Sequence, residues 1–126
     1  MVDDIQGIRD ILTRNNVIAV VGLSANEARP SFFAAKYMQD HGYKIRPVNP
    51  RYKEILGEPC YPDLESIPEP VDMVNLFQRA DKVLPFVQSA IDIKARAVWM
   101  QLGVVNPEAA ELAESAGLAV VMDRCV

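Results

Sequence analysis

Residues 17–31, V-I-A-V-V-G-L-S-A-N-E-A-R-P-S, decide the fold. Five consecutive apolar residues end at Gly22, which is the pattern of a strand buried on both faces at the centre of a parallel sheet. Gly22 allows a turn that a Cβ would obstruct, and a short polar loop then leads into a predicted helix over 31–41. A helix N-terminus leaves backbone N–H groups free and carries the positive end of the helix dipole. A strand, a glycine loop and a helix in this order therefore predict an anion-binding site.

Strand-like and helix-like segments alternate through the rest of the chain. Apolar runs predict strands over 17–23, 43–48, 72–77, 97–102 and 119–123. Start and stop signals predict a helix that begins after Asp3 or Asp4, and further helices over 31–41, 81–93 and 107–116. This alternation predicts an α/β fold with a doubly wound, Rossmann-like parallel sheet of five strands and helices on both faces. With the strands numbered along the chain, we expect the spatial order 3-2-1-4-5.

Length and composition restrict the class of protein. The 126 residues are 50% hydrophobic and 24% charged, which predicts one globular domain over 1–126. The net charge of −4 and the lack of a basic tract argue against a protein that coats nucleic acid. No apolar run reaches the roughly 18–20 residues that cross a bilayer, and the acidic N-terminus lacks the pattern of a signal peptide. Cys60 and Cys125 form no C-x-x-C motif, which favours reduced thiols in the cytoplasm.

The predicted topology indicates where a ligand should bind. In doubly wound sheets, ligands bind outside the carboxyl ends of the strands, at the point where the strand order reverses. In this chain that edge of the sheet collects the segments 22–29, 49–53, 77–82, 101–104 and 123–125.

Two common nucleotide motifs do not fit the sequence. A dinucleotide fingerprint needs G-x-G-x-x-G after the first strand and an acid after the second, but here the loop is G-L-S-A-N-E and the second strand ends in P-V-N-P. Both departures argue against a standard NAD site, and no P-loop motif occurs. NADP stays open as an alternative, because Arg51 could bind its additional phosphate.

Several short motifs follow one another in order: V-G-L-S (21–24), R-P-S (29–31), G-Y-K-I-R-P-V-N-P-R (42–51), V-D-M-V-N-L-F (71–77), W-M-Q-L-G-V (99–104) and M-D-R-C (122–125). Each motif alone is weak evidence for a protein family. Together the motifs cover nearly the whole chain, and the set is specific enough to indicate one. It resembles the small single-domain CoA-binding protein family. That family is similar to the CoA-binding N-terminal domain of the succinyl-CoA synthetase alpha subunit.

The resemblance implies a site for coenzyme A. Its diphosphate would be held by the loop Gly22, Leu23 and Ser24 together with Arg29 and Ser31. These residues offer backbone N–H groups, hydroxyls and a guanidinium, which are the groups that bind phosphate oxygens.

The resemblance implies further contacts along the same edge. Asn49 and Pro50 would form a wall for the adenosine, and either Arg51 or Lys53 would meet the 3′-phosphate. A basic group after the second strand suits this phosphate, whereas an NAD ribose would favour an acid there. The remaining implied residues are Phe77, Gln78 and Arg79 past the third strand and Gln101 near the pantetheine arm.

Three classes of function are compatible with these patterns. No catalytic constellation or metal cluster is visible, and His41 at the end of the 31–41 helix matches no phosphohistidine motif. We therefore predict a non-catalytic module that binds CoA or acyl-CoA, with a protein partner or a homo-oligomer left open. The alternative is an NAD(P)-binding oxidoreductase or redox-sensing domain, and a third class is an interaction module that binds no nucleotide. Cys125 lies on the predicted ligand edge, either as an idle thiol or close enough for a mixed disulfide with CoA.

Overall fold

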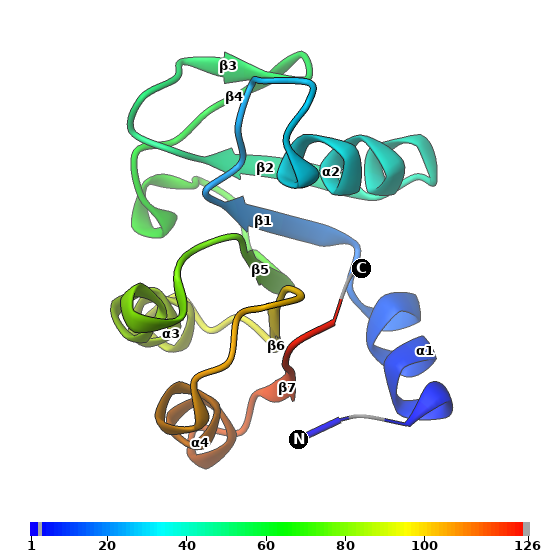
Figure 1. The fold of residues 1–126 in the computed structure, drawn as a ribbon, viewed down its shortest axis with the longest axis vertical. Helices are drawn as coiled ribbons and strands as arrows, with labels where there is room; N and C mark the ends of the chain where they lie inside the picture. The colour runs from blue at the N-terminus through cyan, green and yellow to red at the C-terminus, as the bar shows by residue number, and fades with distance from the viewer. Residues whose placement is uncertain (3, 125–126) are drawn as a thin grey trace.

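A parallel sheet forms the centre of the molecule (Figure 1). The computed structural model describes residues 1–2 and 4–124. The strands of this sheet are β1 (Val17–Val21), β2 (Lys44–Val48), β5 (Met73–Leu76), β6 (Ala97–Met100) and β7 (Ala119–Val121). They pair in parallel in the order β2-β1-β5-β6-β7. The predicted α/β class with a five-stranded parallel sheet is confirmed.

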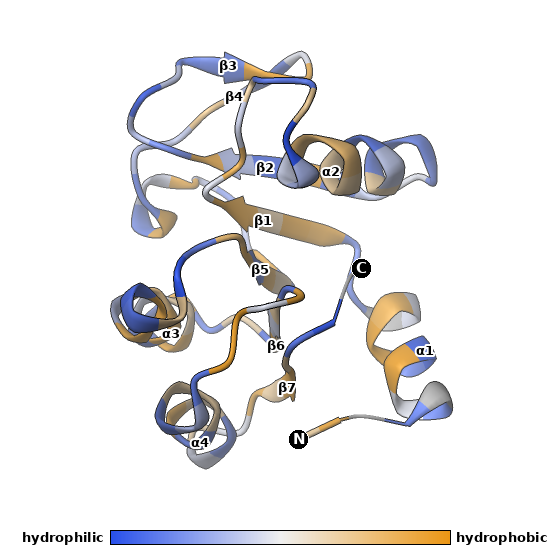
Figure 2. Cartoon of the chain, viewed as in Figure 1, coloured by the Kyte–Doolittle hydropathy of each residue, from blue (hydrophilic) through white to orange (hydrophobic). Residues whose placement is uncertain are grey.

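Helices cover both faces of the sheet. The helices α1 (Ile5–Arg14) and α2 (Pro30–Asp40) lie on one face, and α3 (Val83–Asp92) and α4 (Pro107–Ser115) lie on the other (Figure 1). The side chains of β1 alternate between the two resulting cores, which is why this strand is apolar along its whole length (Figure 2). No helix in the described part of the chain is long and apolar enough to cross a membrane.

The predicted strand order is wrong in one respect. The strand near residues 72–77 lies next to β1, between β1 and β6, and not outside β2. The outer edge of β2 is occupied instead by Tyr61, which forms a single parallel bridge with Val48. The Tyr61 N–H donates to the Pro47 carbonyl at 2.9 Å, and the Asn49 N–H donates to the Tyr61 carbonyl at 2.9 Å. Because one residue takes the place of the expected third strand, the next full strand pairs on the other side of β1.

The connection from β2 to β5 contains little regular structure. It holds a two-stranded antiparallel ribbon of β3 (Glu54–Ile55) and β4 (Glu58–Pro59), followed by the 3₁₀ turn η1 (Leu64–Ser66). Leu56 and Gly57, at the tip of the ribbon, both have positive φ values, as a tight type I′ turn requires. Between β2 and β5 the described chain forms no α-helix that would cover the sheet.

The predicted start of α4 is confirmed. Asn106 is its N-cap and accepts a hydrogen bond from the Ala109 N–H at 3.0 Å, and Pro107 is the first helical residue. Asp4 caps α1 in the same way, whereas Asp3 lies outside the described residues. The helix predicted over 81–93 is divided into the 3₁₀ turn η2 (Ala80–Lys82) and α3.

A partly buried guanidinium ties the β2–β5 connection to the sheet. Arg46 projects from β2 with 16% of its side chain exposed, and it forms ion pairs with Glu69 and with Glu58, the latter at 3.4 Å. The hydrogen bond from Arg46 lowers the pKa of the Glu69 carboxyl below its ordinary value of 4.5, and the same bond raises the pKa of Arg46. Since Glu58 is in β4 and Glu69 precedes β5, this cluster ties both the ribbon and the last part of the connection to β2.

The Glu69→Gln variant should be less stable than the wild type by about 1 kcal/mol near neutral pH, since Glu69 is partly exposed. A lowered carboxyl pKa contributes stability that is complete above the unfolded pKa and is lost as the pH falls through the folded pKa. The difference between variant and wild type should therefore shrink below about pH 4.5. Urea unfolding at about pH 7 and about pH 3.5 measures this difference. Glu65→Gln, an exposed acid on η1, is the control and should change little. If Glu69→Gln lost the same unfolding free energy at both pH values, the Arg46–Glu69 ion pair would not be the source of the stability.

A candidate nucleotide cleft at the carboxyl edge of the sheet

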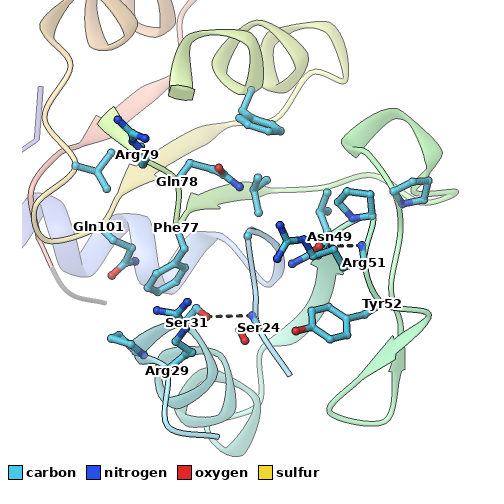
Figure 3. Close-up of a pocket in the computed structure, with 18 of the residues that line it drawn as sticks. Ser24, Arg29, Ser31, Asn49, Arg51, Tyr52, Phe77, Gln78, Arg79 and Gln101 are labelled. Carbon is cyan, nitrogen blue, oxygen red and sulfur yellow. Dashed lines mark hydrogen bonds between the residues drawn. The ribbon is translucent and has the colours of Figure 1, made fainter. Parts of the chain in front are cut away.

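A cleft of about 970 Å³ opens where the carboxyl ends of β1, β2, β5 and β6 meet (Figure 3). It lies at the switch point between β1 and β5, where the sheet order reverses. Among the residues predicted for the site, its lining contains Gly22, Ser24, Arg29, Ser31, Asn49, Pro50, Arg51, Phe77, Gln78, Arg79 and Gln101. Leu23 and Lys53 are not in the lining. The structure thus brings most of the predicted residues together, and their role in binding stays a prediction.

Gly22 brings two strand ends into close contact. Its φ is +84°, and its N–H donates to the Val48 carbonyl at 2.9 Å. A Cβ at this position would overlap the Phe77 carbonyl oxygen and would lie 2.9 Å from Nε2 of Gln78. The glycine is therefore required both by the backbone angle and by the approach of the β5 end.

The loop after Gly22 is held by its own side chains. The Ser24 N–H donates to Oγ of Ser31 at 3.1 Å (Figure 3). The Asn26 N–H donates to Oγ of Ser24, also at 3.1 Å. Ser31 is 6% exposed, and its hydroxyl proton is still available to a ligand because a hydroxyl can accept and donate at once. No side chain caps α2, and Pro30 at its first position has no N–H. The uncapped helix start adds positive potential at the cleft.

Two guanidinium groups reach the cleft from opposite sides of the Gly22 loop. Arg29 comes from the start of α2 and Arg51 from the loop after β2 (Figure 3). Within the described part of the chain, neither forms an ion pair. Arg79 also lines the cleft, but its guanidinium lies 3.3 Å from the Asp81 carboxylate, and both side chains are largely exposed. The cleft is therefore basic although the chain as a whole carries a net charge of −4.

Asn49 joins the loops that follow β1 and β2. Its Nδ2 donates to the Leu23 carbonyl at 3.1 Å, and its Oδ1 accepts from the Arg51 N–H at 3.0 Å. The Leu23 side chain is fully buried beneath the loop, which explains why it does not line the cleft. Both ends of the Asn49 amide are therefore engaged by the protein. Asn49 follows β2 at the position where an NAD site would carry a carboxylate for the ribose, and an asparagine cannot supply one.

The lining also contains residues that were not predicted as ligand contacts, among them Tyr52, Pro62, Phe86 and Val104. Tyr52 and the residues after β6 fall within segments that the topology placed at this edge. Pro62 reaches the cleft because Tyr61 pairs with β2, and Phe86 reaches it from α3. No local sequence signal marks these last two, since their position depends on long-range packing.

Cys60 and His41 give no sign of reactive chemistry in the structure. The Cys60 thiol donates to the Asn49 carbonyl at 3.3 Å, and burial raises its pKa, which disfavours the thiolate. Cys125, considered above for a mixed disulfide, lies outside the described residues. The exposed His41 ring stacks on Tyr37 at the end of α2. Among the described residues, no group of three or more His, Cys, Asp or Glu side chains could hold a metal ion.

Comparisons with known proteins agree with this geometry. A family model described as a CoA binding domain matches residues 16–126. The chain is 40% identical to the uncharacterized protein YneT of Bacillus subtilis over 119 residues, which cover 94% of this chain and 88% of YneT. A solved structure of a hypothetical protein from Pyrococcus horikoshii OT3 has a TM-score of 0.93 at 39% identity and covers 99% of this chain and 92% of that chain.

A longer relative contains a similar domain as one part of its chain. The chain is 31% identical to the ADP-forming acetate–CoA ligase I of Archaeoglobus fulgidus over 121 residues. These residues cover 87% of this chain but only 18% of the ligase. The predicted relation to CoA-binding domains is confirmed, and the chain belongs to the CoA-binding domain family.

Proposed function

We propose that this chain is a non-catalytic module that binds CoA or acyl-CoA in the cleft at the carboxyl edge of the sheet. The observation that carries the proposal is the pair of guanidiniums, Arg29 and Arg51, on either side of the Gly22 loop. A ligand with phosphates at two separate points would satisfy both. We further propose that residues 1–126 act as a single domain in the cytoplasm.

Each part of the ligand has candidate partners. The diphosphate would lie against the Gly22–Ser24 loop, where the Ser31 hydroxyl and the Arg29 guanidinium can donate to it. The adenosine would lie against Pro50 and beside Asn49. Of the two basic residues considered for the 3′-phosphate, Arg51 is favoured, because it lines the cleft and Lys53 does not.

The composition of the cleft favours binding over catalysis. Its described lining contains no carboxylate, imidazole or thiol. The hydroxyls of Ser24, Ser31 and Tyr52 therefore have no such base within the lining to activate them as nucleophiles. A CoA ligase reaction would therefore need groups from elsewhere. The NAD(P)-dependent alternative stays open for NADP, whose additional phosphate could also pair with Arg51.

Thermal unfolding of the full chain with CoA, acetyl-CoA, NAD, NADP or ADP, each at about 1 mM, tests the proposal. A ligand at about 100 times its Kd adds roughly 2.7 kcal/mol of stability, which raises the Tm by several degrees for a domain of this size. We expect CoA and acetyl-CoA to raise the Tm more than the other three. A larger shift with NADP would favour the oxidoreductase class, and no shift with any ligand would contradict a nucleotide site.

A further inference from the structure

A second pocket lies at the amino edge of the sheet, at the opposite end of the strands from the cleft. It has a volume of about 260 Å³ and is lined by Asp10, Ile11, Asn15, Arg96 and Ala119. The first two belong to α1 and Asn15 follows that helix, whereas Arg96 precedes β6 and Ala119 begins β7. The family model begins at residue 16, so the wall that α1 builds lies outside the matched domain. Pockets for drug-sized ligands hold about 300–1,000 Å³, so this one suits a smaller molecule.

Asn15 brings an unpaired hydrogen-bond acceptor to this pocket. The residue is 4% exposed, and its Nδ2 donates to the Ile11 carbonyl at 2.7 Å. A carbonyl oxygen can only accept, so the amide nitrogen must face Ile11 and Oδ1 must point elsewhere. Oδ1 is buried and has no hydrogen-bond partner among the described residues. A buried acceptor without a donor is destabilising, and this one therefore needs a donor from a bound molecule.

The end of α1 does not require the Asn15 side chain. The backbone N–H of Asn15 already donates to the same Ile11 carbonyl at 3.2 Å. A leucine at this position would leave that carbonyl paired and would bury no unpaired acceptor. The asparagine thus carries a cost that the packing of α1 does not offset, which indicates a ligand.

The two walls of the pocket carry opposite charges. The Arg96 backbone is fixed, because its N–H donates to the Asp72 carbonyl at 2.8 Å and its carbonyl accepts from the Ala119 N–H at 3.0 Å. Its side chain is exposed and forms no ion pair within the described part of the chain. On the other wall, the Asp10 carboxylate accepts from Nε2 of Gln6 at 3.0 Å through Oδ1, which leaves Oδ2 for a ligand. Asp10 also lies in the C-terminal half of α1, and the carboxyl end of a helix favours a cation.

We propose that this pocket binds a small α-amino acid in its zwitterionic form. The ammonium group donates to Oδ1 of Asn15 and to the Asp10 carboxylate, and the ligand carboxylate pairs with the Arg96 guanidinium. The buried Ile11 and the half-buried Ala119 supply apolar contacts for a short aliphatic side chain. The pocket shares no lining residue with the cleft, so this inference does not rest on the proposed function.

Titration calorimetry of the full chain with L-alanine, propionate and ethylamine tests the proposal. Propionate lacks the ammonium group of L-alanine, and ethylamine lacks its carboxylate. We expect saturable binding of L-alanine and at least about tenfold weaker binding of either analogue, because each loses one set of charge-assisted hydrogen bonds.

Three variants assign the binding to this pocket. Arg96→Gln and Asn15→Leu should each weaken L-alanine binding about tenfold or more. Arg9→Gln removes the same charge from an exposed residue of α1 outside the lining, and it should change the affinity by less than about twofold. Without ligand, Asn15→Leu should have a Tm no lower than that of the wild type, since it removes an unpaired acceptor. A selective loss of binding in this variant then excludes misfolding as its cause.

Three outcomes overturn the inference. The first is no saturable binding of glycine, L-alanine or L-valine at concentrations up to about 50 mM, well above a millimolar Kd. The second is wild-type affinity in Arg96→Gln, which would place the amino acid elsewhere on the molecule. The third is a clearly lower Tm for Asn15→Leu with unchanged L-alanine binding in Arg96→Gln, which would make the Asn15 amide a purely structural group.

Discussion

The Gly22→Ala variant is expected to lose about 3 kcal/mol of unfolding free energy and nearly all affinity for CoA. Forcing a residue with a Cβ to a φ of +84° costs about 1–2 kcal/mol. Overlap with the Phe77 carbonyl adds about 1–3 kcal/mol, because a backbone atom cannot move aside as the end of a side chain can. Relief of this overlap would push the Gly22 loop away from β5, and the diphosphate site would lose its shape.

Gly117→Ala is the matched control for this prediction. Gly117, after α4, also has a positive φ of +88°, but no atom lies within 4 Å of the position its Cβ would take. This variant should lose only about 1–2 kcal/mol and should bind CoA as the wild type does. Urea unfolding and calorimetric titration measure the two effects. Equal losses in the two variants would show that the close approach of Phe77 contributes nothing.

Arg51→Ala is expected to weaken CoA binding by about 10- to 100-fold. A hydrogen bond between a guanidinium and a phosphate contributes about 1.5–3 kcal/mol, and Arg51 lines the cleft without a competing carboxylate among the described residues. Titration with CoA and with dephospho-CoA, which lacks the 3′-phosphate, measures the effect. The loss should appear with CoA and should be nearly absent with dephospho-CoA.

Two further variants test whether Arg51 contacts the 3′-phosphate. Lys53→Ala removes the same charge from an exposed residue outside the cleft lining and should change the CoA affinity by less than about twofold. Arg29→Ala should weaken CoA and dephospho-CoA alike, because Arg29 is placed to meet the diphosphate. If Arg51→Ala also weakened both ligands equally, Arg51 would contact the diphosphate and not the 3′-phosphate.

Local patterns predicted the elements of this fold better than their arrangement. The apolar run of β1 and the capping signal at Asn106 depend on neighbouring residues, and the structure contains both. The strand order depends on which segment pairs with the outer edge of β2. Tyr61 takes that edge with a single bridge, and one residue leaves no periodic pattern in a sequence.

The same distinction applies to the cleft. The rule that ligands bind at the carboxyl ends of parallel strands placed most of the lining residues correctly, since it needs only the strand boundaries. It did not reveal that the Asn49 amide is engaged by its own loops or that Gln101 is hydrogen-bonded to Asn75. The bonds from Asn49 to Leu23 and from Gln101 to Asn75 each join residues 26 positions apart in the sequence, so no local pattern reveals them. An asparagine in the middle of an apolar strand was nevertheless a visible sign that something polar lay beside it.

The contact at Tyr61 also covers a sheet edge that could otherwise pair with another molecule. An open parallel sheet exposes unpaired N–H and C=O groups on its two outer strands, and these groups can recruit a strand from another molecule. Here Tyr61 occupies the outer edge of β2, and on the opposite side the Val2 N–H donates to the Val120 carbonyl of β7 at 2.7 Å. Each contact takes up backbone groups that a continuous ladder with a neighbouring chain would need. The departure from the expected strand order thus gives the sheet a protected border without the length of a sixth strand.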